Sequence, residues 1–350
     1  MIACFPRDMT LGRAPTLLAV VVMLSLVVLP GDSRAEQADP RQKPLVPLPA
    51  KVPSPKDNPG TVAKVELGRQ LFFDPRLSGK NTMSCASCHL PDKAFGDGLA
   101  RARGANRKRL SRNTPTLINV GFYNRFFWDG RARSLEEQAL GPIGAADEMN
   151  QDLGELEQEL DAIPGYARQF RAVFGARVTR IGIARALAAF QRTLVTGRSA
   201  FDRYLAGDEK ALSKSARRGL ALFTGGAGCV RCHRGPLLSD GKLYRLGVAS
   251  QDKGLAGVTG RKDDTGKFRT PTLRNVAQTG PYMHDGSMKT LDEVVTFYYR
   301  GVPMSLAGHP VDLKPLLGQG LSGVPDIVDF LESLTGRVPK VTRPKLPRDQ

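Results

Sequence analysis

Apolar residues recur along much of the chain with the three-to-four-residue spacing of amphipathic helices, and alternating strand patterns are nearly absent. This spacing predicts one helix through residues 153–160 and another from Ile181 to Leu194. A last helix is predicted through residues 324–334, and we expect it to stop at Gly336. The pattern therefore favours an all-α fold.

The first 60 residues lie outside this pattern. An apolar run at residues 17–29 follows Arg7 and Arg13, and small residues lead up to Ala35, as in a secretory signal peptide (residues 1–35). The run is shorter than the roughly 20 residues that span a bilayer. We therefore expect cleavage after Ala35 and no stable membrane span afterwards, with an uncleaved anchor as the alternative. Residues 36–60 hold seven prolines, which predicts an extended tail or strap.

Four sequence blocks then occur twice in the same order, which indicates an internal repeat. The blocks are Gly-x-x-Leu-Phe, Cys-x-x-Cys-His, Thr-Pro-Thr-Leu and an Asp-Gly pair followed by a capping box, Ser134 with Glu137 and Thr290 with Glu293. The last two blocks share an offset of 156 residues, whereas the Cys-x-x-Cys-His blocks are 144 apart, so the connection is longer in the second copy. We expect two helical domains, residues 61–200 and 201–340, that arose by duplication.

The two Cys-x-x-Cys-His blocks contain every cysteine except Cys4, which lies in the predicted signal. They are Cys85, Cys88 and His89, and Cys229, Cys232 and His233. Two thiols at this spacing reach both vinyl groups of one haem, and the next residue places its imidazole on the iron. A redox Cys-x-x-Cys or a zinc site is the alternative for a single motif. Two such motifs behind an export signal predict two covalently bound c-type haems and no structural disulfide.

The formal net charge is +17, and +16 without the signal. Haem propionates would offset part of it. Six basic residues cluster in one short stretch, namely Arg101, Arg103, Arg107, Lys108, Arg109 and Arg112. A basic patch can indicate nucleic-acid binding, but an exported protein rarely meets nucleic acid, so we expect none. The cluster is either a solvated loop facing propionates or a docking site for an acidic protein partner.

The second face of each haem iron decides the function. Two axial side chains make an electron-transfer haem, whereas an open face can bind peroxide. Outside the two motifs the only histidines are His284 and His309, both in the second copy. The first haem therefore has no further histidine from its own copy. We expect His284 at the edge of the second haem, near a propionate, and His309 in a loop.

Two stretches carry the motifs of a known family. The first is Phe127-Trp128-Asp129-Gly130-Arg131 with Gln138, Pro142 and Glu148 after it, and the second is Pro281-Tyr282-Met283-His284-Asp285-Gly286. They resemble the bacterial di-haem cytochrome c peroxidases, and the resemblance runs from about Leu67 to Gly336. It implies two cytochrome-c-like domains. It also implies a peroxide-reacting haem in the N-terminal domain and an electron-transferring haem in the C-terminal domain.

Tyr298 departs from the usual family pattern. The sixth ligand of the second haem is commonly a Met, 14 residues after the histidine that matches His284, and here that position is Tyr298. A tyrosine there marks the MauG-like branch, named for methylamine utilisation, which matures a protein-derived quinone cofactor. The equivalent position in the first copy is Pro142, which cannot ligate iron. The alternative is that Tyr298 is a core residue and that its neighbour Tyr299 has been confused with it.

The resemblance also implies roles for residues of the first pocket. Glu148 matches the carboxylate that moves a proton during peroxide cleavage, within hydrogen-bond reach of the peroxide oxygens. Gln138 and Pro142 would shape the same pocket. The alternative is that Glu148 is a surface residue of an acidic stretch.

Four further residues are implicated by the same resemblance. Trp128, the only tryptophan, would lie between the haems and carry electrons, or else would simply pack beside one haem. Asn113, Thr279 and Pro281 match positions that hold a calcium ion between the domains, the latter two through backbone carbonyls.

Three functions remain in competition. The first is a periplasmic MauG-like enzyme, in which peroxide, or oxygen plus electrons, forms a high-valent di-haem state that oxidises a protein substrate. In the MauG-like branch this substrate is the precursor of methylamine dehydrogenase, and its oxidation matures a tryptophan-derived quinone cofactor. The second is a cytochrome c peroxidase that reduces hydrogen peroxide with electrons from a small cytochrome or cupredoxin. The third, a plain electron carrier, is disfavoured by Pro142. Tyr298 favours the first. Some MauG-like members carry a surface Trp just before the second haem motif, where this chain has Ala227.

Overall fold

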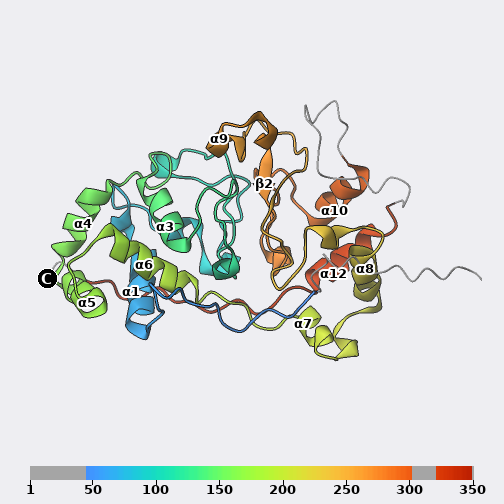
Figure 1. The fold of residues 1–350 in the computed structure, drawn as a ribbon, viewed down its shortest axis with the longest axis horizontal. Helices are drawn as coiled ribbons and strands as arrows, with labels where there is room; N and C mark the ends of the chain where they lie inside the picture. The colour runs from blue at the N-terminus through green and yellow to red at the C-terminus, as the bar shows by residue number, and fades with distance from the viewer. Residues whose placement is uncertain (1–44, 302–320, 349–350) are drawn as a thin grey trace, which may run out of the picture. The chain divides into compact units, whose positions relative to one another are not determined.

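The computed structural model describes residues 45–301 and 321–348, which form a mainly helical fold with one small sheet (Figure 1). The α-helices are α1 (Val62–Phe73), α2 (Cys85–Cys88), α3 (Leu135–Gly144), α4 (Leu153–Asp161), α5 (Pro164–Phe174), α6 (Arg180–Gln191), α7 (Ala200–Leu205), α8 (Lys214–Thr224), α9 (Ala256–Thr259), α10 (Leu291–Arg300) and α12 (Val324–Glu332). The predicted signal and His309 lie outside the described residues. Within the described ranges, none of the helices combines the length and apolar character that a membrane crossing requires.

The all-α prediction missed one structural element. The strands β1 (Leu243–Arg245) and β2 (Lys267–Arg269) pair antiparallel, with Tyr244 opposite Phe268. Together with α9 they occupy the connection that is longer in the second sequence copy. The extra length of that copy is therefore a small folded arm.

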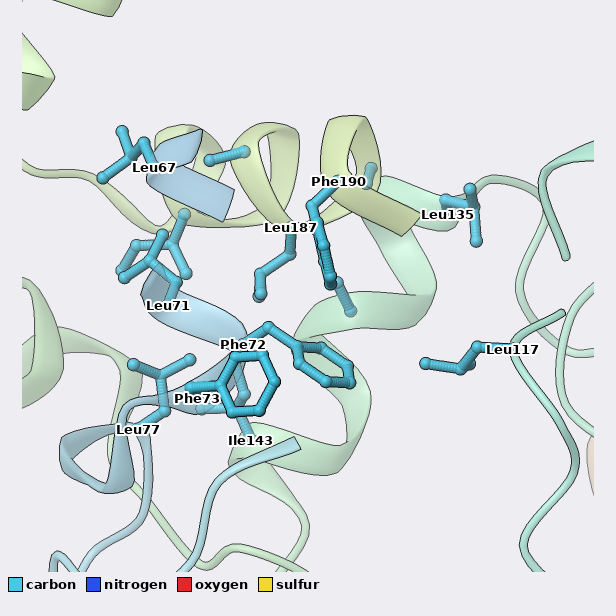
Figure 2. Close-up of a cluster of buried hydrophobic side chains, with 14 of the residues drawn as sticks. Leu67, Leu71, Phe72, Phe73, Leu77, Leu117, Leu135, Ile143, Leu187 and Phe190 are labelled. Carbon is cyan, nitrogen blue, oxygen red and sulfur yellow. The ribbon is translucent and has the colours of Figure 1, made fainter. Parts of the chain in front are cut away.

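The buried apolar side chains form two clusters. The first runs from Leu67 to Leu194 and the second from Phe201 to Leu334. In Figure 1, α1 and α3–α6 form one group of helices, and α7, α8, α10 and α12 form another. Figure 2 shows Phe72 of α1 and Phe190 of α6 inside the first cluster, where their ring centroids are 5.1 Å apart.

Each cluster contains two helices that cross at a glycine. A Cβ on Gly68 of α1 would lie 1.9 Å from the carbonyl oxygen of Ala186 in α6. A Cβ on Gly219 of α8 would lie 1.9 Å from the carbonyl oxygen of Asp326 in α12. Only glycine permits so close an approach of two backbones, so each crossing depends on its glycine.

The predicted helices are present with shifted ends. The prediction for residues 153–160 is confirmed by α4, and α6 covers most of the second predicted helix. Ile181 was expected on the buried face but is 59% exposed, because the buried residues of α6 begin at Gly182 instead. The last helix ends at Glu332, before Gly336 is reached.

Both predicted capping residues start their helices. Ser134 accepts a hydrogen bond from the Glu137 amide at the start of α3, and Thr290 does the same at the start of α10. The glutamate side chains reach one residue further back than a capping box requires. They accept from the amides of Arg133 (2.7 Å) and Lys289 (2.6 Å).

The N-terminal and C-terminal segments of the described chain have no helix or strand, and each runs between the two clusters. Leu45 packs against the second cluster, whereas Asn58 donates to the backbone oxygen of Arg185 in α6 at 3.0 Å. The described part of the Pro-rich segment is therefore a strap rather than a loose tail. The C-terminal segment returns from α12 to the first cluster, against which Val338 and Val341 pack.

Candidate active site

The first Cys-x-x-Cys-His motif is held on a single helical turn. Cys85 and Cys88 begin and end α2, and His89 follows as its C-cap. The His89 Nδ1 atom lies 3.0 Å from the Phe95 carbonyl oxygen, so this nitrogen is the donor and Nε2 remains available to a metal. Burial lowers the pKa of His89, which favours the neutral imidazole that binds iron.

The second motif repeats this arrangement on a 3-10 turn, Cys229–Arg231. The His233 Nδ1 atom lies 3.0 Å from the Leu238 carbonyl oxygen, and burial lowers the pKa of His233 as well. No disulfide joins the four cysteines of the described chain. Each motif therefore presents two thiols and one oriented imidazole.

A cavity of about 930 Å³ adjoins the second motif, and we call it the second cavity after that motif. Its walls include Cys229, Cys232 and His233, and its volume is in the range typical of cofactor sites. Two buried polar atoms of its lining residues, the Tyr123 hydroxyl and the His284 Nε2, have no hydrogen-bond partner among the described residues. Both can donate to a carboxylate, so the cavity suits a haem whose propionates would accept these bonds.

Tyr298 and Tyr299 differ in their surroundings, although both border this cavity. Tyr299 is 4% exposed and belongs to the second core cluster, where its hydroxyl lies 2.6 Å from the position that a Cβ on Gly323 would take. Tyr298 is not a member of that cluster. Burial, together with Cys229 and Cys232, raises the pKa of Tyr298 above its usual value.

Glu148 lies near the first motif. Burial, Asp97 and Glu148 together raise the pKa of Cys88 to about 11, so the carboxylate is within electrostatic reach of that thiol. Burial and Asp147 raise the pKa of Glu148, and Arg131 and Arg112 partly oppose this shift. A half-buried carboxylate with a raised pKa is suited to proton transfer.

The backbone around Glu148 is fixed from two directions. The Met149 amide donates to the Pro142 carbonyl of α3 at 3.1 Å, and the Ala105 amide donates to the Glu148 carbonyl at 2.7 Å. Gln138 and Pro142 lie one turn apart on α3, and both are half-buried. The three residues predicted for the first pocket thus belong to one connected segment.

Trp128 extends from the first sequence copy into the wall of the second cavity. Its indole Nε1 donates to the Asn113 carbonyl at 2.9 Å, and its own carbonyl accepts from the Arg269 amide of β2 at 2.8 Å. Trp128 is therefore held by both sequence copies, whichever role it performs.

Arg112 differs from the other residues of the basic cluster because it forms ion pairs inside the protein. Its guanidinium donates to Asp129 and to Asp252, each at 2.6 Å, and so joins the two sequence copies through buried or half-buried carboxylates. Of the other members, Arg101 is half-buried, and Arg103, Arg107, Lys108 and Arg109 are exposed.

The amino-acid sequence is similar to those of a known protein family. A family model described as di-haem cytochrome c peroxidase matches residues 62–210. The cytochrome-c peroxidase IdrP1 of Denitromonas iodatirespirans is 43% identical over 351 residues, covering 90% of this chain and 93% of that protein. The methylamine utilization protein MauG of Methylorubrum extorquens is 42% identical over 311 residues, covering 85% and 86%. The chain belongs to the di-haem cytochrome c peroxidase family.

A solved structure supports the same assignment for the fold. A MauG-like protein associated with microbial copper homeostasis superposes with a TM-score of 0.72 at 32% identity, covering 86% of this chain and 95% of that one. The protein is thus a peroxidase-type oxidoreductase that carries two covalently bound c-type haems. The two motifs and the cavity described above are the parts of this di-haem peroxidase that would hold them.

The three residues predicted to bind calcium, Asn113, Thr279 and Pro281, all border the second cavity. The Asn113 side-chain amide donates to the Leu99 carbonyl at 2.8 Å, which leaves its oxygen as the atom for a metal. Within the described ranges, no group of three or more His, Cys, Asp or Glu side chains could hold a metal ion. Calcium binding by this di-haem peroxidase remains a prediction.

Three side chains of the second cavity were not predicted from the sequence. Arg269 is 7% exposed, and its guanidinium carbon lies 3.8 Å from the centroid of the Tyr123 ring. The Tyr244 hydroxyl donates to Asp240 at 2.7 Å. Arg269 and Tyr244 belong to the folded arm, so the longer second connection was the available signal. No sequence signal marked Tyr123.

Proposed function

We propose that this di-haem peroxidase is a periplasmic MauG-like enzyme that uses peroxide, or oxygen plus electrons, to oxidise a protein substrate. The observation that carries the proposal is Tyr298, which stands on α10 at the wall of the second cavity where many family members have Met. A phenolic oxygen is a hard, anionic donor when deprotonated and stabilises oxidised iron, whereas a thioether raises the reduction potential. A second haem that holds oxidising equivalents suits a partner too large to reach the first haem.

The substrate class follows from the relatives. The MauG relative of Methylorubrum extorquens is named for methylamine utilisation. We propose by analogy that the substrate is a methylamine dehydrogenase precursor, whose tryptophan-derived quinone the enzyme would mature. Export by the predicted signal would bring the enzyme to the periplasm, the compartment in which we place this reaction.

We also propose that the two haem domains, residues 61–200 and 201–340, arose by duplication. The matched glycine crossings at Gly68 and Gly219 support this, and so do the left-handed backbone conformations of Asn119 (φ 60°) and Asn275 (φ 59°) after each Thr-Pro-Thr-Leu block. In this alignment Pro142 takes the place of Tyr298. One copy thus supplies a ligand and the other leaves room for peroxide.

The bound haems supply the iron that reacts with peroxide and the iron that exchanges electrons. His89 and His233 would each hold one iron through Nε2. Glu148 would accept a proton from the inner oxygen of peroxide and return it to the departing oxygen, with Gln138 and Pro142 limiting the space around it. Trp128 would provide an aromatic ring between the two sites. His284 and Tyr123 would hold propionates.

Calcium would bind at Asn113, Thr279 and Pro281 through one amide oxygen and two backbone carbonyls. Hard oxygen donors of this kind suit calcium, with water completing its coordination. The ion would then stabilise the contact between the Asn113 segment and the Thr279 loop. That contact already includes the hydrogen bond from the Asn113 amide to the His284 carbonyl at 2.7 Å.

The second candidate is a cytochrome c peroxidase that takes electrons from a small cytochrome or cupredoxin and reduces hydrogen peroxide. The specific observation in its favour is that the relative with 43% identity is named a cytochrome-c peroxidase. Exposed basic residues near the first motif, such as Arg103 and Lys108, would suit an acidic electron donor.

Replacing Tyr298 by Met separates these candidates. We expect Tyr298→Met to raise the reduction potential of the second haem by on the order of 100 mV, within the roughly 0.8 V that axial ligands control. Oxidation of a protein substrate should be lost, while peroxide reduction with a small donor persists. Redox titration and assays with both donors measure this.

Tyr299→Phe is the matched control, and it should leave the potential unchanged. A large shift of the potential in Tyr299→Phe with none in Tyr298→Met would assign the ligand to Tyr299 instead of Tyr298. If neither variant changes the second haem, the MauG-like proposal fails and the cytochrome c peroxidase function replaces it.

A further inference from the structure

Tyr244 of β1 forms a three-residue cluster with Asp240 and Cys232 at the edge of the second cavity. The Tyr244 hydroxyl donates to the Asp240 Oδ2 atom at 2.7 Å, and Cys232, which borders the same cavity, contributes to the raised pKa of this phenol. Tyr244 borders the cavity and is neither fully buried nor fully exposed. Because Cys232 is a haem-attachment residue, the phenol lies beside the point where that haem is joined to the chain.

Asp240 is fixed in position as a proton acceptor. Its side chain is only 4% exposed, and its amide donates to the Cys232 carbonyl at 2.8 Å. The Arg234 guanidinium lies 3.9 Å from the Asp240 Oδ2 atom, so it holds the carboxylate in place as an ion-pair partner at a longer distance than the Tyr244 hydroxyl. Its other carboxylate oxygen accepts from the Lys242 amide at 3.0 Å. A carboxylate held at this distance from a phenol is within the range over which protons are transferred directly.

This arrangement matters because a tyrosine that gives up an electron becomes a strong acid and must release its proton. In low-dielectric surroundings the positive charge on an oxidised, still protonated tyrosine is costly. The electron therefore leaves easily only where a hydrogen-bonded base can accept the phenolic proton. Among the tyrosines that border this cavity, Tyr282 offers the contrast. Its hydroxyl donates to the Val276 backbone carbonyl at 3.1 Å, and a carbonyl oxygen cannot take the proton at ordinary pH.

We propose that Tyr244 is a redox relay between the second haem and an electron donor at the surface. Tyr244 gives one electron to the oxidised haem while its phenolic proton passes to Asp240, leaving a neutral tyrosyl radical and a protonated carboxyl group. One electron from the donor then restores the phenolate oxygen, and Asp240 returns the proton. Peroxide supplies the oxidant, as the peroxidase activity of the family requires. The inference depends on that activity and not on Tyr298.

Electron paramagnetic resonance of rapidly frozen samples tests the relay directly. The full-length holoenzyme is mixed with hydrogen peroxide in the absence of any electron donor, once with ordinary and once with ring-deuterated tyrosine. We expect an organic radical whose spectrum narrows on deuteration. Tyr244→Phe should abolish it, whereas Tyr282→Phe should retain it in full.

Asp240→Asn is a second variant that keeps an oxygen to accept the hydrogen bond but cannot take the proton. Radical formation should then slow by roughly 10²–10⁴-fold, the usual value of a positioned proton acceptor. Absorbance spectra of each variant check that both haems are attached. A radical that is insensitive to tyrosine deuteration, that survives Tyr244→Phe, or that never forms would overturn the relay. None of these results bears on the redox titration of Tyr298→Met.

Discussion

The two halves of the described chain share a framework and differ in what it surrounds. In each half a glycine lets two helices cross in contact, a histidine donates to a backbone carbonyl, and a capped helix follows an Asp-Gly turn. The capped helix of the first half carries Pro142 and that of the second carries Tyr298. Each half of the framework therefore presents one haem-attachment motif, and in the proposed function one position on the capped helix determines what the iron of that half can bind.

The halves also contribute unequally to the second cavity. Trp128 and Tyr123 come from the first half, while the folded arm of the second half supplies Tyr244 and Arg269. The Arg269 amide donates to the Trp128 carbonyl at 2.8 Å, so the arm that is unique to the second half also holds the tryptophan of the first. The second cavity is thus lined by both halves, whereas the residues predicted for the first pocket, Glu148, Gln138 and Pro142, all come from the first half.

The largest effect that we expect from a substitution in the first half concerns Glu148. Glu148→Gln should leave both haems attached but slow the reaction with peroxide by roughly 10²–10⁴-fold, because the amide cannot accept a proton. The pKa of Glu148 is raised by burial and by Asp147, so the active carboxylate form is lost at a higher pH than for an ordinary glutamate. The wild-type rate should therefore fall as the pH drops through this raised pKa, and stopped-flow mixing measures it.

The exposed neighbour Asp147 provides the control for this prediction. Asp147→Asn removes a charge that raises the pKa of Glu148, so the acidic limb of the pH profile should move to lower pH while the rate at neutral pH stays near wild type. An unchanged rate in Glu148→Gln would return Glu148 to the role of a surface residue. The first half would then have no identified proton carrier.

Features formed by residues close in the chain were predicted from the sequence, whereas features that depend on contacts between distant residues were not. The haem motifs and both helix caps were predicted because their residues are close in the chain. The strands β1 and β2 were missed, since three residues are too few to show alternation. Ile181 was misplaced because neighbouring positions of a helix lie on different faces. The Arg112–Asp252 pair joins residues 140 positions apart, and no local pattern indicates it.

We expect an intermediate loss of stability when the glycine at either helix crossing is replaced by alanine, and no such loss at a helix position without a close neighbour. Gly68→Ala and Gly219→Ala each place a Cβ 1.9 Å from a backbone oxygen, which forces two helices apart. Overpacking of this kind costs about 3 kcal/mol of unfolding free energy or more. If the two frameworks are equivalent, thermal unfolding should show similar losses in both variants.

Gly144→Ala is the matched control for these crossings, because a Cβ at that position meets nothing within 4 Å. It should be neutral or stabilise the protein by up to about 1 kcal/mol, the difference in helix propensity. A loss in Gly68→Ala without one in Gly219→Ala would show that the second half is supported mainly by other contacts, such as the buried Arg274–Asp202 ion pair.

The smallest loss of stability should come from substitutions at the helix caps. These variants also allow stability to be compared with the spectra of the second haem. Ser134→Ala and Thr290→Ala each remove one hydrogen bond from a helix start and should cost about 1 kcal/mol. Part of each cap persists, because Glu137 and Glu293 still accept from the amides before the cap. The two losses of thermal stability should therefore be alike. Their spectroscopic consequences should differ, because α10 carries the proposed ligand Tyr298 and α3 carries the non-ligating Pro142.

Loosening α10 should therefore broaden the absorbance bands of the second haem in Thr290→Ala, whereas loosening α3 in Ser134→Ala should leave that haem unchanged. Thr290→Ser and Ser134→Thr keep a capping hydroxyl and should restore both stability and spectra. If Ser134→Ala perturbs the second haem as strongly as Thr290→Ala does, α3 of the first half affects the haem of the second half. The contacts through Trp128 and the folded arm would then transmit strain from the first half to the second.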